Sequence, residues 1–270
     1  MPFATSLGAR IYWEEEGQGD PLLMIMGLGY SLHMWREMRP MMARRFRAIV
    51  FDNRGVGSSD PPGGLISMAA MARDAAAVMD AAGVPTAHVL GMSMGGMIAQ
   101  ELTLTFPERV RKLVLGCTNC GALRSVPTSP KALELLVTRF THRPEERAET
   151  IIPWLYHPET SRESIEQDLS LLRVHYPKPS VVLKQLGAIA GWSSLGRLKR
   201  IQSPTLVIHG EDDRLVPAGN ARIIARRIPN AKLVMLARAG HIFPTDQTES
   251  SVSAILEFLL GSTPTGSAAR

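Results

Sequence analysis

Short apolar runs alternate with helical patterns in the first half of the chain, and this alternation restricts the fold more than any other feature. Between Ser67 and Ala82 apolar residues recur on one helix face, Ser67 can cap the helix, and Gly83 can end it. Strand–helix–strand alternation predicts a parallel sheet covered by helices. The runs typical of buried strands are Pro21–Met26, Arg47–Phe51, His88–Met92 and Lys112–Gly116.

The alternation stops after about Asn119 and resumes near the C-terminus. The intervening pattern is helical, with segments at Leu133–Phe140, Pro144–Leu155 and Ser164–His175. Two further strand-like runs, Thr205–His209 and Lys232–Leu236, precede a last helix near Thr248–Leu260. We therefore predict an α/β fold with a mostly parallel sheet of about eight strands, helices on both faces and a helical cap insertion. The predicted core comprises residues 1–120 and 196–270, and the predicted cap comprises residues 121–195.

The charge of the chain does not indicate a nucleic-acid partner. The formal net charge is +5 over 270 residues, but the basic residues are spread along the chain among acidic ones. The short basic pairs, Arg44-Arg45 and Arg226-Arg227, have no interleaved aromatic residues of the kind that stack on bases. We interpret the excess as a solvated basic face.

The cysteines and the N-terminus bear on the compartment. Cys117 and Cys120 form one C-x-x-C pair, which cannot complete a zinc site, and Cys117 ends an apolar run as a core thiol would. Two cysteines suggest no disulfide framework. The N-terminus lacks a signal-peptide pattern, and runs such as Leu22–Met26 are too short to span a membrane. We expect a cytoplasmic protein with no membrane partner.

The segment Gly91-Met92-Ser93-Met94-Gly95-Gly96 lies directly after an apolar strand and directly before an amphipathic helix. A serine on such a tight turn is held exposed, and the flanking glycines relieve crowding. The helix N-terminus adds unpaired N–H groups that favour a developing negative charge. The position indicates a nucleophile at Ser93, whereas the structural alternative is a helix cap in a glycine-rich loop.

With this segment, the chain resembles the α/β-hydrolase fold superfamily over nearly its whole length. It is most similar to serine carboxylesterases and lactonases near the 3-oxoadipate enol-lactonases and polyketide methylesterases. The match rests on several stretches in the family's order, each weak alone. They are Met26-Gly27-Leu28-Gly29, Phe51–Asp60, the segment around Ser93, His209–Pro217 and Ala239-Gly240-His241.

A serine nucleophile needs a base, and the base needs an acid that orients it. His241 follows a strand-like run late in the chain, as the order Ser, Asp, His requires. The resemblance implies that Asp213 is the acid, while the adjacent Asp212 is the alternative. His209 lies at a strand end, and the resemblance gives it no catalytic part.

The resemblance also implies an oxyanion hole made by the backbone N–H groups of Leu28 and Met94. The chain departs from the commoner family pattern here, because Met26 stands where His is usual and Gly29 stands where Pro is usual. Since backbone groups supply the donors, we expect the hole to be retained.

The surroundings of the turn are rich in methionine. Met24, Met26, Met92, Met94 and Met97 pack in the core or form an adaptable pocket wall. Trp154 and Trp192 fit either lid aromatics or packing anchors of helices. The predicted substrate-pocket residues are Gly27, Gly29, Tyr30, Trp154, Trp192 and Ile242.

These residues predict a serine hydrolase that cleaves carboxylic esters or lactones of small, largely apolar substrates through an acyl-enzyme on Ser93. No nucleotide-binding or metalloprotease motif is present, so we expect no cofactor and no metal. A Ser nucleophile in place of Asp argues against a haloalkane dehalogenase or an epoxide hydrolase. The alternatives are cofactor-free perhydrolysis of the haloperoxidase type, acyltransferase activity or C–C bond hydrolysis at the same residues, or a small-molecule receptor with vestigial hydrolysis. The physiological substrate and the oligomeric state are left open.

Overall fold

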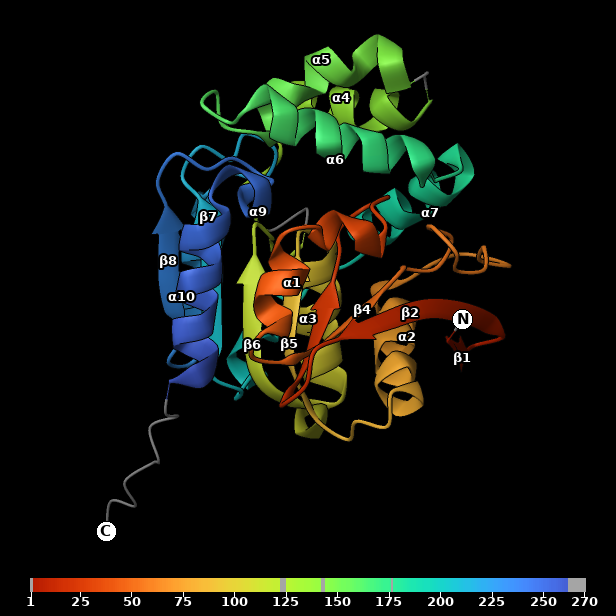
Figure 1. Ribbon diagram of the computed structural model, residues 1–270, viewed down its shortest axis with the longest axis vertical. Coiled ribbons are helices and arrows are strands. Elements are labelled where there is room, and N and C mark those ends of the chain that lie inside the picture. Colours follow the sequence, from red (N-terminus) through yellow and green to blue (C-terminus); the bar gives the residue numbers. More distant parts are fainter. Residues whose placement is uncertain (1, 122–124, 142–143, 176, 262–270) are drawn as a thin grey trace.

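The fold is organised around one eight-stranded sheet (Figure 1). The computed structural model describes residues 2–121, 125–141, 144–175 and 177–261. The strand order is β1-β2-β4-β3-β5-β6-β7-β8, and β2 is the one strand of this sheet that runs opposite to the others. The prediction of a mostly parallel sheet is therefore confirmed. The strands are β1 (Phe3–Ser6), β2 (Ala9–Glu16), β3 (Pro21–Ile25), β4 (Arg47–Phe51), β5 (Ala87–Met92), β6 (Val110–Gly116), β7 (Thr205–Gly210) and β8 (Lys232–Leu236).

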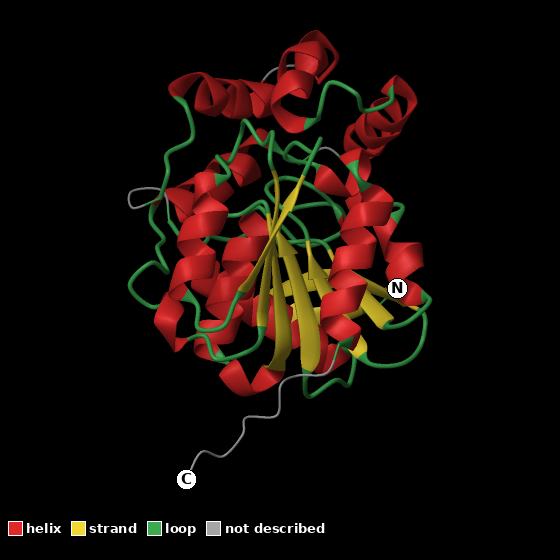
Figure 2. Cartoon of the chain, turned by 90° about the vertical axis from the view of Figure 1, so that its left-hand side faces the viewer, coloured by secondary structure: helices red, strands yellow, loops and turns green. Residues whose placement is uncertain are grey.

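Helices cover both faces of the sheet (Figure 2). On one face α2 (Met68–Ala81), α3 (Met94–Thr105) and α8 (Gly219–Arg227) share a core with alternate strand residues such as Leu23 and Val89. On the other face α1 (Met38–Ala43) and α10 (Thr248–Leu260) pack with the intervening residues, such as Leu22 and Leu90. This two-sided burial explains why the central strands read as continuous apolar runs.

Helices α4 (Pro130–Thr141), α5 (Pro144–Leu155), α6 (Arg162–Val174) and α7 (Pro179–Ala190) lie between β6 and β7. We call them the cap helices, because Figure 1 shows them grouped beyond the carboxyl ends of the strands. The bridge between Gly121 and Ser193 holds both ends of this segment together. That pairing suits an insertion, and the domain division at residues 121 and 195 stays our interpretation.

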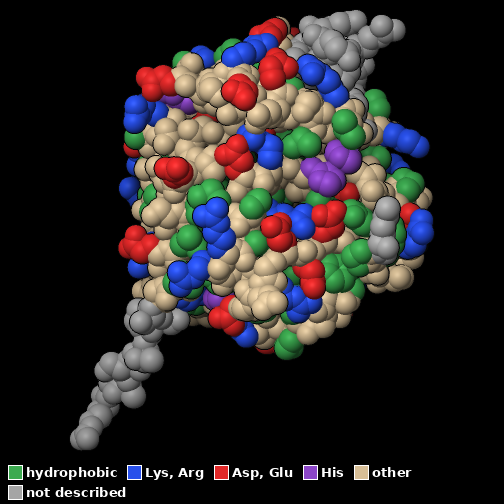
Figure 3. Space-filling view, in the orientation of Figure 1, with side chains coloured by type: hydrophobic (Ala, Val, Ile, Leu, Met, Phe, Trp, Pro, Cys, Tyr) green, Lys and Arg blue, Asp and Glu red, His purple; other side chains and the backbone are tan. Residues whose placement is uncertain are grey.

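Two surface properties bear on partners. No helix in the described part of the chain is long and apolar enough to cross a membrane. On the face shown in Figure 3, Lys and Arg side chains lie interspersed with Asp and Glu. The expected absence of a nucleic-acid partner stays a prediction.

Candidate active site

Ser93 lies on the turn between β5 and α3, in a strained backbone conformation. Its φ is +55°, a region that non-glycine residues rarely adopt. Two glycines make the turn possible, because side chains would not fit at their positions. A Cβ on Gly91 would lie 2.3 Å from the carbonyl oxygen of Gly95, and a Cβ on Gly95 would lie 2.0 Å from the carbonyl oxygen of Ile25. The backbone N–H of Ser93 donates to Gly116 at 2.8 Å, which ties the turn to β6. The strain is thus held by tight packing on both sides of the serine.

Three side chains that are far apart in the sequence meet beside this turn. The Oγ of Ser93 lies 3.0 Å from Nε2 of His241, and Nδ1 of His241 lies 2.8 Å from Oδ2 of Asp213. Because a carboxylate accepts, Nδ1 carries the proton and Nε2 is left to accept the Ser93 hydroxyl proton. His241 and Asp213 follow β8 and β7, so parallel strands deliver both to the sheet edge where Ser93 sits.

The carboxylate of Asp213 is buried and surrounded by donors. Its Oδ1 accepts the backbone N–H groups of Leu215 and Val216 at 2.9 and 2.8 Å. Its Oδ2 also lies 3.2 Å from Nε2 of His209. Burial alone raises the pKa of Asp213, but His241 and His209 outweigh it and hold that pKa well below its ordinary value. The acid therefore stays ionised while buried.

The structure distinguishes between the candidates for the acid. Asp212 is half exposed and lies 3.6 Å from His157, so it points away from His241. His209 is fully buried, and its Nε2–H donates to the carbonyl of Val216 at 2.8 Å as well as facing Asp213. Its place behind the acid was missed, and a strand-end histidine four residues before an aspartate is the one sequence signal that could have suggested it.

The two residues expected to form the oxyanion hole lie next to the serine. Met94 begins α3, and Leu28 lies in the loop that follows β3. A Cβ on Gly27 would lie 3.1 Å from the Cβ of Ser93, so this loop passes directly against the nucleophile. Asn53 donates from Nδ2 to the carbonyl of Met26 at 2.8 Å and anchors the start of the loop.

A cavity of about 510 Å³ opens onto Ser93 and His241 between the sheet edge and the cap helices. Its described lining contains Tyr30, Asn119 and Thr128 as further polar residues and no Asp, Glu, Lys or Arg. The rest of the wall is apolar, with much of it supplied by α4 and α7. The cavity is of a size that suits a small organic ligand.

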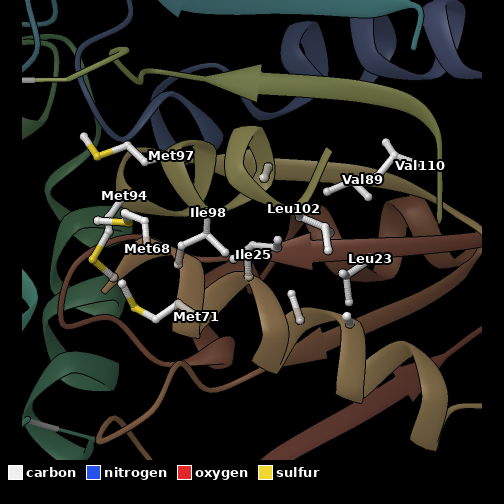
Figure 4. Close-up of a cluster of buried hydrophobic side chains, with 14 of the residues drawn as sticks. Leu23, Ile25, Met68, Met71, Val89, Met94, Met97, Ile98, Leu102 and Val110 are labelled. Atoms are coloured by element: carbon white, nitrogen blue, oxygen red, sulfur yellow. The ribbon is translucent and has the colours of Figure 1, made fainter. Parts of the chain in front are cut away.

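The methionines around the turn pack in the core, and most of them also line the cavity. Met26, Met92, Met94 and Met97 line the cavity, whereas Met24 is fully buried in the core. Figure 4 shows Met94 beside Met68 and Met71 of α2, with Met97 close by. All five methionines are buried, so the core interpretation holds for each of them, and four of them also line the cavity.

The predicted pocket residues also divide. Gly27, Tyr30 and Ile242 line the cavity, but Gly29, Trp154 and Trp192 do not, and we correct these three assignments. The indole N–H of Trp192 donates to Glu101 at 2.7 Å, and the ring of Trp154 lies beneath the guanidinium of Arg214. The backbone N–H of Gly29 points to Gln185 instead of the cavity. Polar partners outside the cavity thus determine where all three lie.

One group of potential metal ligands occurs in the described residues, formed by Cys117, His209 and Asp213 with ligand atoms within 4.8 Å of one another. All three are buried and engaged elsewhere. The thiol of Cys117 lies between the N–H of Gly210 and the carbonyl of Gly240, and burial raises its pKa well above normal. Each of the three already has a hydrogen-bond partner within the fold, which fits a packing role behind Asp213.

Comparisons with known proteins agree with the fold described above. A family model described as alpha/beta hydrolase fold matches residues 20–247. The protein named "Putative carbamate hydrolase RutD" from Azorhizobium caulinodans is 34% identical, over 90% of this chain and 92% of its own. A poly(3-hydroxyalkanoate) depolymerase from Ectopseudomonas oleovorans is 33% identical, over 88% and 84%. The solved structure of a thermophilic esterase from Thermogutta terrifontis is similar with a TM-score of 0.82 and 30% identity, covering 96% of each chain.

Proposed function

The chain belongs to the α/β hydrolase fold family, and on this premise we propose that it is a serine hydrolase that cleaves neutral carboxylic esters or lactones through an acyl-enzyme on Ser93. The observation that carries the proposal is the hydrogen-bonded chain from Ser93 through His241 to Asp213, which opens onto an uncharged cavity. Relatives named as an esterase and a poly(3-hydroxyalkanoate) depolymerase support the ester bond as the target.

In the proposed mechanism, Oγ of Ser93 attacks the carbonyl carbon while Nε2 of His241 takes the hydroxyl proton. The negative charge on the carbonyl oxygen is met by the N–H groups of Leu28 and Met94, each worth about 10²–10³ in rate. His241 then returns the proton to the departing alkoxide. A water molecule, deprotonated by the same imidazole, cleaves the acyl-enzyme and frees the acid.

Asp213 contributes through the imidazole and not through substrate. Its carboxylate fixes the tautomer of His241 and stabilises the imidazolium that forms in each half-reaction. The donors around its oxygens keep it charged in a buried place, and a buried carboxylate of that kind is what an imidazolium needs.

The cavity wall supports a neutral, apolar substrate class. A carboxylate bound within it would lose its hydration without gaining a cationic partner, and such burial costs free energy. The side chains of α4 and α7 complete the wall, so we further propose that residues 121–195 act as a cap that sets the acyl and alcohol groups accepted.

Ester turnover by a panel of substrates tests the function. The panel comprises p-nitrophenyl acetate, butyrate and octanoate and two γ-lactones, with wild type beside Ser93→Ala. We expect wild type to turn over at least one member and Ser93→Ala to lose at least about 10³-fold in kcat while its thermal unfolding is unchanged. Intact mass after rapid quenching should show an acyl adduct in wild type alone.

Two results would contradict the proposed function. One is a Ser93→Ala variant as active as wild type, which would place the chemistry elsewhere. The other is a persistent adduct with no steady-state release, which would favour the receptor alternative over an enzyme.

A further inference from the structure

The loop of residues 26–30, which carries the proposed oxyanion donor Leu28, is held at both ends by buried amide side chains. Asn53 donates to the carbonyl of Met26 at 2.8 Å, just before the donor peptide. On the other side, the N–H of Gly29 donates to Oε1 of Gln185 at 3.1 Å. The peptide that joins Gly27 to Leu28 and bears the Leu28 N–H therefore lies between two fixed neighbours.

Gln185 reaches this loop from the cap. It lies on α7, 156 residues away in sequence from Gly29, and its side chain has no exposed surface. Its Nε2 faces the carbonyl of Arg54 at 3.5 Å, next to Asn53 in the loop after β4. Gln185 thus links a cap helix with two loops at the carboxyl ends of the strands.

The backbone of Gly29 explains why the contact with Gln185 is needed. Its φ is +69°, a conformation closed to proline, and it carries a buried N–H that needs an acceptor. In this chain Gln185 supplies that acceptor. Without it, the peptide after Leu28 would have to rotate to find another partner or water.

We propose that Gln185 is a positioning residue for the oxyanion hole. The inference rests on the proposed function, because it takes the Leu28 N–H as a donor in ester hydrolysis. An oxyanion hole accelerates the reaction when its donors are already aimed at the place where charge develops. By holding Gly29, Gln185 keeps the Leu28 peptide in that orientation before substrate arrives.

The same helix also contacts substrate space. Leu186 and Ile189 of α7 line the cavity, while Gln185 of the same helix faces the loop of residues 26–30. The position of α7 therefore both completes the apolar wall of the cavity and orders the loop of residues 26–30.

The test compares Gln185→Met, which keeps the shape and removes the acceptor, with Gln185→Glu, which keeps an acceptor oxygen. Gln100→Met is the matched control. Gln100 is equally buried and bonds through both ends of its amide to Asn119 and Ser194, away from residues 26–30. Each variant is assayed for kcat and KM on the best ester, for thermal unfolding, and for binding of a trifluoromethyl ketone, whose adduct with Ser93 places an oxyanion in the hole.

We expect Gln185→Met to lower kcat about 10- to 100-fold with KM changed less than about threefold, and to weaken trifluoromethyl ketone binding by the same factor. Gln185→Glu should recover most of that loss. Gln100→Met should lower the unfolding temperature but keep kcat and inhibitor affinity within about threefold of wild type.

The inference fails if Gln185→Met binds the trifluoromethyl ketone as wild type does, or if Gln100→Met loses as much activity. If Gln185→Met does not fold, Gln185→Asn decides, because it retains a buried amide but withdraws the oxygen from Gly29. A Gln185→Asn variant with wild-type kcat would then overturn the proposal. An inactive wild type would instead refute the proposed function, so the two failures are distinct.

Discussion

Each oxygen of the Asp213 carboxylate has its own task. Oδ1 accepts hydrogen bonds from two backbone N–H groups of its own loop, those of Leu215 and Val216. These two bonds fix the side chain independently of the histidines. Oδ2 is then aimed at His241, with His209 beside it. A carboxylate with its orientation set by the backbone can hold the imidazole in a single tautomer.

Replacing Asp213 with Asn should abolish most activity and cost stability. An amide nitrogen cannot accept hydrogen bonds, so one set of donors around position 213 must lose its acceptor. We expect kcat to fall about 10³- to 10⁴-fold with KM little changed, measured on the best ester of the panel. Asp212→Asn is the matched control and should retain wild-type kcat, and an Asp213→Asn variant within tenfold of wild type would disprove the role.

His88 should make folding sensitive to acid. It lies on β5 under Phe46, and burial together with the charges of Lys112 and Arg111 lowers its pKa to about 4, with Asp20 opposing them. The unfolded chain takes up this proton near pH 6.5 and the folded chain near pH 4, so stability is lost as the pH falls between these values. After allowance for solvent screening, the loss is about 2 kcal/mol.

Urea unfolding at pH 7.5 and pH 4.5 measures this loss. His88→Gln cannot take up the proton, so the difference between the two pH values should shrink by about 2 kcal/mol relative to wild type. An equal pH dependence in both proteins would show that His88 is not the group responsible.

At the scale of elements, the turn from β5 to α3 works because α3 approaches the end of β3 very closely. Gly95→Ala would bring a Cβ to 2.0 Å from the carbonyl oxygen of Ile25, and backbone atoms there cannot move without displacing the loop of residues 26–30. We expect a loss of at least about 3 kcal/mol in the free energy of unfolding, or no soluble protein.

Gly187→Ala provides the matched comparison for that substitution. Gly187 lies within α7, and a Cβ there meets nothing within 4 Å, so alanine should stabilise by about 0.5–1 kcal/mol. Chemical denaturation of both variants checks the pair. Equal unfolding midpoints would contradict the close approach of α3 to β3.

Most elements that the sequence predicted are buried on both sides or have one clear apolar face, and the exception is the edge strand β8, which is partly exposed. Strands β3 to β8 read as apolar runs, and α2 has a side-chain cap at Ser67. The strands β1 and β2 were missed because β2 is half exposed and ends in the acidic run Glu14–Glu16. Helix α8 was missed since its first residue is Gly219 and its surface is strongly basic.

The predicted site was likewise strongest where local pattern suffices. A turn, a strand end and a late histidine led to Ser93, Asp213 and His241, whose side chains the fold then brings within hydrogen-bond distance. Gln185 and the part of the cavity wall that the cap helices supply could not be predicted, because they depend on how α7 docks against a loop near the other end of the sequence. No local pattern marks one buried glutamine in a helix as the acceptor of a distant N–H.

Over the whole molecule, one buried carboxylate, of Asp168, and one half-buried carboxylate, of Asp246, hold the cap helices onto the sheet edge. Asp168 of α6 accepts bonds from Arg36 and Thr245 of the core. Asp246, in turn, accepts the N–H of Gly240, beside His241, and of His157 between α5 and α6. Burial raises the pKa of both carboxyls, which these donors partly offset. The cap helices are therefore fastened beside His241, and the apolar cavity lies between the two parts.

The apolar wall of the cavity leads to a prediction about substrate charge. The described cavity wall has no Lys or Arg, so an acyl chain that ends in a carboxylate must be desolvated without a partner. For p-nitrophenyl pentanoate and p-nitrophenyl hemiglutarate, which differ mainly in that charge, we expect kcat/KM to be at least about 30-fold lower for the hemiglutarate, equivalent to about 2 kcal/mol.

Leu183 lines the cavity and is 51% exposed, so Leu183→Arg can place a hydrated cation at the edge of the cavity. This variant should reduce the ratio of the two kcat/KM values several-fold. Leu65→Arg adds the same charge at a fully exposed position away from the cavity and should leave the ratio as it is, which separates a local effect from the net charge of the protein. Equal rates for the two esters in wild type would mean that the acyl chain extends into solvent and that the cavity wall does not select it.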